Sequence, residues 1–539
     1  MRMRHHIGRD QSGKPTLWSG RRVPARARGA GLALALLAAA CGGTGQYSAQ
    51  YAGELYSLDN FYGGIVADEP RAALVGREIL AAGGNAVDAA VATYFVMSTT
   101  MPSTAGLGGG GVCVVHRGED DKIADEVFDF LPRAAAGGLV AVPGSARGMA
   151  ALSARYGKLP WSQLVAPAEA IAQAGEAASR ALAKDVALGE KKLRADPAMA
   201  ALFVRPDGAL LQEGDNLRQS ALAGVLGQLR AKGPGEFYGG LLGQQIVAGA
   251  QALGAPLTIE DLRNFQVQVY APLEIKWGDQ LVMMPKPPAA GGVSVAQMLQ
   301  ALRSEGGNHF TFLAEASRRI AGDRAQWMQP GGDASQPVES LIAADHVAQV
   351  LQGQPGANAL PENPFAASIV AADAEGLGVA CNFTMNALFG AGRIAEGTGL
   401  ILAPAPDERG FGFSALAPIV MANRNNGEFY FASAASGGLA GALAQADVLH
   451  GVTEGKLSLE AAMLRARVFN GGDKVLYDAS GNENPGGALQ AAGFQAEQRK
   501  GIGRINAIFC PGGSPTNPET CQVRNDFRGD GLANFVTSD

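Results

Sequence analysis

The sequence predicts a large globular protein of mixed helices and strands. Of its 539 residues, 47% are hydrophobic, 17% are charged and 74 are glycine. This composition is typical of a soluble protein rich in glycine turns, and it excludes a disordered or fibrous chain. From about residue 67 onward, helical and strand-like segments alternate without an internal repeat. Length alone does not set the number of domains, because large single-domain enzymes are common.

Local sequence patterns predict the helices and strands. Residues 71–82 are predicted to form a helix that stops at Gly83 and Gly84. The glycines within residues 106–111 precede a strand instead of following one, so close backbone packing explains them better than phosphate binding does. Further helices are expected over 87–98, 161–174, 293–302, 309–327 and 439–449, and strands over 112–116, 367–372, 378–385 and 429–433.

The N-terminus has the features of an export signal. Arginines precede an apolar run at residues 30–40, which is shorter than the roughly 20 residues that a membrane-spanning helix needs. Leu37 to Cys41 resembles a bacterial lipoprotein cleavage site, with a plain cleaved signal as the alternative. We therefore expect a signal peptide over 1–40, a lipidated Cys41 and tether over 41–61, and export to the periplasm or outer cell envelope.

Charge and histidine spacing limit the partners. Without residues 1–40, the chain carries 36 basic and 49 acidic residues, a formal charge of −13. Such a surface repels phosphate backbones, so nucleic acid is not expected, and membrane contact is expected only through the N-terminal lipid. The six histidines show no paired metal-ligand spacing. We expect neither a metal nor a cofactor.

Four cysteines lie outside the signal region. Cys113 and Cys381 lie in apolar, strand-like segments and are expected to be buried thiols. Cys510 and Cys521 bracket a loop rich in proline and glycine, and an oxidising compartment would let them form a disulfide.

Several sequence blocks resemble the gamma-glutamyltransferase family, and they occur in the family's order. The blocks are Gly83 to Ala89, Gly106 to Gly111, Val142 to Gly144, Tyr156 to Trp161, Thr258 to Leu262 and Gly503 to Ile508. The resemblance runs from about Tyr62 to the C-terminus. It implies the α+β fold of N-terminal-nucleophile hydrolases, an αββα sandwich with two stacked antiparallel sheets between helical layers. Residues 62–365 would correspond to the large subunit of the processed family members and residues 366–539 to the small subunit.

The resemblance also implies a reaction. Family members hydrolyse glutathione or transfer its gamma-glutamyl group, and one threonine performs both self-cleavage and acyl transfer from the start of a strand. An ungapped count places that threonine at Ala366, where a methyl group cannot attack a carbonyl. Ser368 is the nearby hydroxyl, on the same strand face but ~6.5 Å further on.

Other family positions are partly kept. Thr384 matches a threonine that supports the nucleophile, and Asn386 matches an asparagine that contacts substrate. Gly437 and Gly438 match the glycine pair whose amides stabilise the oxyanion, although a tight strand-to-helix turn would also explain them.

The substrate-binding positions have changed more. The arginine that grips the substrate carboxylate is replaced by Leu131, with Arg133 close by. Asp407 and Glu408 occupy the acidic pair that binds the amino group, and Ser414 keeps one of two adjacent serines.

The sequence therefore predicts an envelope member of this family that stays unprocessed and has impaired catalysis, with a gamma-glutamyl peptide as a small-molecule ligand. An active amidase or acylase that uses Ser368 is one alternative. A non-catalytic binding or envelope-scaffold protein is another.

Overall fold

The computed structural model describes residues 58–118, 125–356, 358–360, 363–407, 412–480 and 483–538. The predicted signal peptide, Cys41 and the tether up to residue 57 lie outside these residues, and so does Glu408. In the described part of the chain, no helix is long and apolar enough to cross a membrane.

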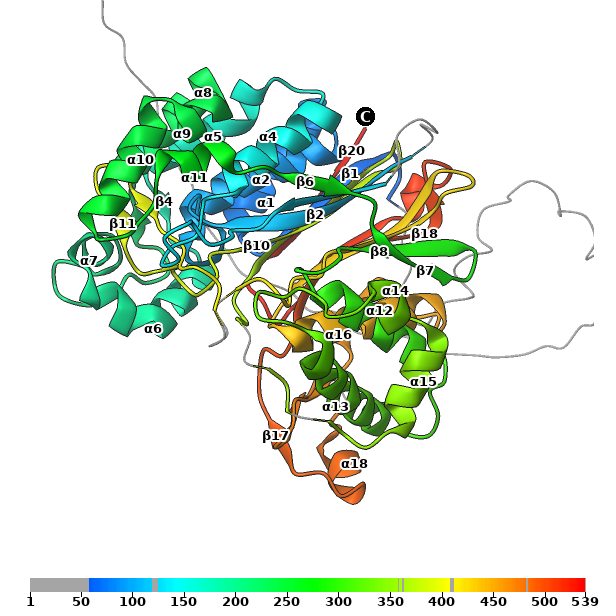
Figure 1. The fold of residues 1–539 in the computed structure, drawn as a ribbon. Coiled ribbons are helices and arrows are strands. Elements are labelled where there is room, and N and C mark those ends of the chain that lie inside the picture. The colour runs from blue at the N-terminus through cyan, green and yellow to red at the C-terminus, as the bar shows by residue number, and fades with distance from the viewer. Residues whose placement is uncertain are drawn as a thin grey trace, which may run out of the picture. The chain divides into compact units, whose positions relative to one another are not determined.

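Two antiparallel sheets form the centre of the fold (Figure 1). The strands of the seven-stranded sheet, in spatial order, are β20 (Leu532–Thr537), β1 (Phe61–Ala67), β9 (Ala367–Asp373), β10 (Leu377–Thr384), β2 (Gly110–Arg117), β3 (Glu126–Phe130) and β6 (Gln268–Tyr270). Those of the six-stranded sheet are β19 (Gln522–Asn525), β18 (Arg504–Ser514), β14 (Glu428–Ser436), β13 (Ile419–Asn423), β8 (Gln280–Met284) and β7 (Leu273–Trp277). Val66 and Val370 of the first sheet pack against Val420 and Ile508 of the second in one apolar cluster.

Helices cover the outer face of each sheet. Those associated with the seven-stranded sheet are α1 (Pro70–Ala81), α2 (Ala86–Thr100), α3 (Pro102–Ala105), α4 (Ser145–Tyr156), α5 (Trp161–Ala174), α6 (Arg180–Ala195), α7 (Pro197–Phe203), α8 (Ser220–Lys232), α9 (Pro234–Gly239), α10 (Leu241–Ala252) and α11 (Ile259–Asn264). Those associated with the six-stranded sheet are α12 (Gly291–Leu302), α13 (His309–Trp327), α14 (Val338–Leu341), α15 (Ala344–Gln352), α16 (Leu439–Thr453), α17 (Leu459–Leu464) and α18 (Gly486–Ala491). The predicted α+β sandwich, with two stacked antiparallel sheets between helical layers, is confirmed.

Smaller elements complete the fold. They are the pairs β4 (Glu176–Ala177) with β5 (Asn216–Leu217) and β11 (Ile394–Ala395) with β12 (Leu400–Ile401), the sheet of β15 (Arg467–Asn470), β16 (Val475–Asp478) and β17 (Ala496–Gln498), and the 3-10 turn η1 (Pro518–Thr520).

Helix α2 shows how the sequence sets an element at the core. Asn85 caps its start by accepting from the Asp88 amide (2.9 Å), and the Asp88 carboxylate accepts from the Asn85 amide (3.1 Å). Every residue of the helix is buried, which is why it lacks the polar face that would mark a surface helix. It packs against β9 and β10 and so supports the strands that carry the site.

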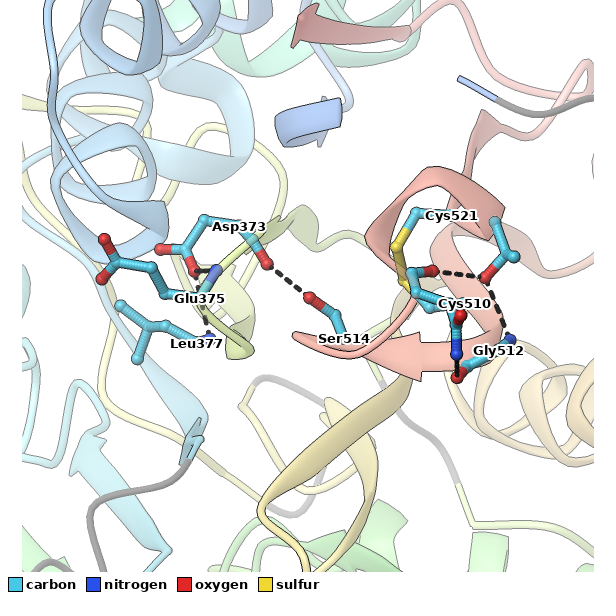
Figure 2. Close-up of a disulfide and its surroundings, with 9 residues drawn as sticks. Asp373, Glu375, Leu377, Cys510, Gly512, Ser514 and Cys521 are labelled. Atoms are coloured by element: carbon cyan, nitrogen blue, oxygen red, sulfur yellow. Dashed lines mark hydrogen bonds between the residues drawn. A yellow bond between two sulfur atoms is a disulfide. The ribbon is translucent and has the colours of Figure 1, made fainter. Parts of the chain in front are cut away.

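Both cysteine pairs are oxidised. Cys510 and Cys521, 11 residues apart, are joined at the hairpin of β18 and β19 (Figure 2). The expectation of free thiols at Cys113 and Cys381 was wrong, because these residues face each other across the β2–β10 pair with Cα atoms 4.1 Å apart and form a disulfide. Their sequence separation of 268 leaves no local sequence signal for this pairing.

Candidate active site

The site lies where the chain enters β9. Ala366 immediately precedes this strand, is 4% exposed and belongs to the apolar cluster between the two sheets. Its side chain is a methyl group, which offers no lone pair for attack on a carbonyl.

The peptide carbonyl before Ala366 is held by polar groups. The Asn363 side-chain amide donates to the Phe365 oxygen at 2.9 Å, and the Thr384 hydroxyl approaches the same oxygen at 3.5 Å. The Thr384 hydroxyl also accepts from the Asn363 side chain (3.1 Å) and from the Asn386 backbone amide (2.9 Å). The Thr384 hydroxyl therefore accepts two hydrogen bonds and lies beside the peptide oxygen that precedes Ala366.

The glycine pair lies on the other side of this segment. The Gly437 amide donates to the Pro364 carbonyl oxygen at 2.9 Å. Gly437 and Gly438 have φ values of 113° and 66°, a conformation that favours glycine, and they lead directly into α16. The first amide of the predicted oxyanion pair is thus occupied by the protein's own chain.

Ser368 lies two residues further along β9 and is completely buried. Its hydroxyl donates to Asp68 Oδ2 (3.0 Å) and accepts from Asn506 Nδ2 (2.8 Å), while its backbone amide donates to the same Asp68 oxygen (2.8 Å). Burial raises the pKa of Asp68, although the nearby Arg504 charge and the hydrogen bonds from Ser368 and Asn506 oppose this shift. This triad joins the end of β1 to β9 and β18, and sequence patterns alone did not indicate it.

Leu131, which replaces the family's carboxylate-binding arginine, and the neighbouring Arg133 have other surroundings. Leu131 is fully buried between the sheets, where no charge could reach solvent. Arg133 donates to Asp129 Oδ2 at 2.6 Å and lines a separate cavity of about 530 Å³ beside α11. Its guanidinium is therefore committed to a neighbouring carboxylate.

Asn386 lies beside Thr384 with φ of 60°. Its side-chain NH₂ group donates to the carbonyl oxygens of Pro132 and Pro404, each at 2.9 Å. The side-chain oxygen Oδ1 is buried and has no hydrogen-bond partner within the described residues. An acceptor in this state carries a desolvation cost until a donor reaches it.

The remaining predicted residues border the same region. Asp407 is half-buried next to the undescribed residues that include Glu408. Ser414 is also half-buried, and its carbonyl oxygen accepts from the Gly291 amide (2.7 Å) and from Arg324 Nη2 (2.9 Å). The described part of the chain contains no cluster of histidine, cysteine, aspartate and glutamate that could hold a metal.

Comparisons with known proteins agree with the resemblance found in the sequence. Residues 72–536 match the family model described as gamma-glutamyltranspeptidase. The Acylase ACY 1 proenzyme of Pseudomonas sp. (strain V22) is 28% identical over 516 residues, covering 84% of this chain and 91% of that protein. The glutathione hydrolase proenzyme of Escherichia coli (strain K12) is 28% identical over 387 residues, covering 64% of this chain and 66% of that protein.

A solved structure extends the likeness to the fold. The cephalosporin acylase from Bacillus halodurans aligns with a TM-score of 0.76 at 22% sequence identity, covering 90% of this chain and 97% of that chain. At this identity the similarity concerns the fold alone.

Proposed function

Because the chain belongs to the gamma-glutamyltranspeptidase family, we propose that it is an envelope member that remains one unprocessed chain, with gamma-glutamyl transfer impaired or absent. The main support for this proposal is Ala366, which stands at the entry to β9. It directly follows a peptide carbonyl that receives hydrogen bonds from Asn363 and Thr384. The surroundings of the reaction are present while the attacking hydroxyl is replaced by a methyl group. Neither self-cleavage nor acyl transfer can proceed by the family mechanism from that residue.

The proposed location is the periplasm or outer cell envelope, with a lipid on Cys41. The signal-like residues 1–40 support export. Two disulfides, Cys113–Cys381 and Cys510–Cys521, fit an oxidising compartment. The lipid itself is proposed from the residues preceding Cys41.

A specific observation supports an active amidase or acylase as a second candidate. Ser368 Oγ lies 3.0 Å from Asp68 Oδ2, a carboxylate that could take its proton, and burial raises the pKa of Asp68. Against this candidate, Ser368 is completely buried and its hydroxyl is already paired on both sides. A third candidate, a binding or scaffold protein without chemistry, is supported by the apolar Leu131 at the carboxylate-binding position and by the pairing of Arg133 with Asp129.

Intact mass and N-terminal sequencing of the protein purified from an exporting host test the proposal. We expect one species that begins at Cys41 and carries the added mass of a lipid. The same preparation should release no chromophore from a gamma-glutamyl anilide above the level given by a Ser368→Ala variant. A second N-terminus at Ala366 or Ser368, or chromophore release that Ser368→Ala abolishes, would contradict the proposal and support the amidase.

A further inference from the structure

The segment 363–365, here named the strap, lies between the Gly437 amide and the Thr384 hydroxyl. Its Pro364 carbonyl receives the Gly437 amide (2.9 Å), and its Phe365 carbonyl faces the Thr384 hydroxyl (3.5 Å). The Phe365 side chain packs against an apolar cluster that includes Met385, Phe389 and Ala403. The strap thus presents two carbonyls and an aromatic ring to this site.

The strap is held partly by its own turn and partly by hydrogen bonds from the Asn363 side-chain amide to the Thr384 hydroxyl (3.1 Å) and the Gly412 carbonyl (3.3 Å). The Asn363 side chain accepts from the Phe365 amide (3.0 Å) and donates to the Phe365 carbonyl (2.9 Å), so part of the strap's polar bonding is internal. Pro364 is exposed, Phe365 is half-buried, and the strap belongs to no helix or strand. Segments of this kind open at lower cost than the strands they adjoin.

The polar groups around the strap fit a peptide better than a free amino acid. Arg133 already pairs with Asp129, and Leu131 is an apolar core residue, so no contact within the described residues assigns a cation to a ligand carboxylate. By contrast, Asn386 Oδ1 is a buried acceptor that lacks a donor among the described residues. A ligand amide N–H would satisfy it.

We propose that the strap is a displaceable intramolecular occupant of this site, and that the external ligand is a peptide or N-acyl amide carrying an aromatic side chain. The ligand carbonyl would take the donors that now hold the strap, its ring would replace Phe365 on the apolar cluster, and its N–H would reach Asn386 Oδ1. This inference rests on the proposed function, because it assigns a ligand to a site that performs no chemistry.

Calorimetric binding of N-acetyl-L-phenylalaninamide to the intact chain tests the inference. In Phe365→Ala the competing ring is absent, so we expect binding about tenfold tighter than in the unchanged protein. Molecules whose site is filled by the strap cannot bind the ligand, and the measured affinity of the unchanged protein is lower for that reason. Phe494→Ala removes another half-buried phenylalanine, which packs against a different cluster, and should bind like the unchanged protein. N-acetyl-L-alaninamide and glutathione should show no gain in Phe365→Ala.

Hydrogen exchange on the unchanged protein tests displacement without any substitution. Saturating N-acetyl-L-phenylalaninamide should increase amide exchange at Phe365 and Ala366 while the protection of β10 is retained. Unaltered exchange at the strap, or equal binding to Phe365→Ala and Phe494→Ala, would overturn the displacement. An equal gain for glutathione would overturn the aromatic ligand class. Turnover of a gamma-glutamyl anilide would instead overturn the proposed function. A cleaved chain, detected by its mass, would separate that outcome from a failure of the strap inference alone.

Discussion

The two ends of β9 are organised in different ways. At its entry, the Phe365 carbonyl is held by Asn363 and Thr384, and the next side chain is the Ala366 methyl group. At its exit, the buried Asp373 carboxylate accepts amides from Ala86 (3.0 Å), Glu375 (3.0 Å) and Leu377 (3.1 Å). The Asp373 backbone oxygen also accepts from the Ser514 hydroxyl at 3.0 Å (Figure 2).

This difference separates the scaffold from the chemistry. The exit is a tight turn whose polar groups are paired with α2, β10 and β18, and these contacts hold the layers together whatever happens at the entry. At the entry, Thr384 and Gly437 hold a segment of chain that lies at the expected self-cleavage position of the family. Under the proposed function, the methyl group of Ala366 would therefore leave the fold intact while removing the attacking group.

The largest expected effect is a change of covalent structure in Ala366→Thr. The donors around the Phe365 carbonyl are already in place, so the new hydroxyl should attack it and convert most of the chain into two fragments. Denaturing electrophoresis and N-terminal sequencing should find a second N-terminus at residue 366. Gamma-glutamyl anilide hydrolysis should stay near background even in the cleaved variant, since Leu131 provides no carboxylate grip.

Ala367→Thr is the matched control, because it adds the same side chain one residue later, on the opposite strand face. It should remain a single chain. An uncleaved Ala366→Thr would show that the entry has lost more than its nucleophile, and rapid anilide turnover would show that the recognition contacts are still adequate.

The next effect compares two disulfides. Cys113–Cys381 links two strands near the entry and closes 268 residues, whereas Cys510–Cys521 sits in the exit-side hairpin and closes 11. In the chain-entropy account, their removal costs about 6 and about 3 kcal/mol respectively. Denaturant unfolding of the two Cys→Ala double variants measures both values. A larger loss for the hairpin bridge would contradict the entropic ordering and assign more of the stability to local packing.

The same contrast explains how far the sequence could predict the structure. The helices expected over 161–174 and 309–327 match α5 and α13, because Pro160 and Asn308 mark their starts. The helix expected over 87–98 extends to Thr100, since burial on all sides removes the polar pattern that would mark its end. Local signals were therefore sufficient for these elements.

Long-range pairings could not be predicted in this way. The Cys113–Cys381 bridge depends on the register of β2 with β10, and the contact of Gly437 with Pro364 joins residues more than 70 positions apart. The position of Ala366 came from the family resemblance, while its neighbours' hydrogen bonds became visible only in three dimensions. The role of Arg133 could not be predicted from the sequence either, because its hydrogen bond to Asp129 is visible only in the structure.

A pH-dependent effect should appear at the exit of β9. Burial raises the pKa of Asp373 from 3.8 to about 6. Because the pKa of Asp373 is higher in the folded state than in the unfolded state, its protonated form stabilises the fold. This contribution is fully present below about pH 4 and is lost as the pH rises through 6. The loss of unfolding free energy is at most about 3 kcal/mol. In Asp373→Asn this pH dependence should disappear, although the amide will lower stability at every pH because its NH₂ group faces backbone donors.

Urea unfolding between pH 4 and pH 7.5 measures this slope. Asp345→Asn, which changes an exposed aspartate in α15, should retain the slope of the unchanged protein. An unaltered slope in Asp373→Asn would assign the pH dependence to other groups.

The smallest expected effect lies between the two ends, at Ser368. Replacing it with alanine removes the hydroxyl bonds to Asp68 and Asn506, while Asp68 keeps the Ser368 backbone amide and the Asn506 side chain (2.9 Å). Because these partners remain, the loss should be about 1–2 kcal/mol of unfolding free energy, with the chain still intact by mass. A variant of normal stability that loses a measurable amidase activity would place Ser368 in the chemistry. The predicted loss of stability, with the chain still intact, would place Ser368 with the scaffold, where it joins the two sheets two residues beyond Ala366.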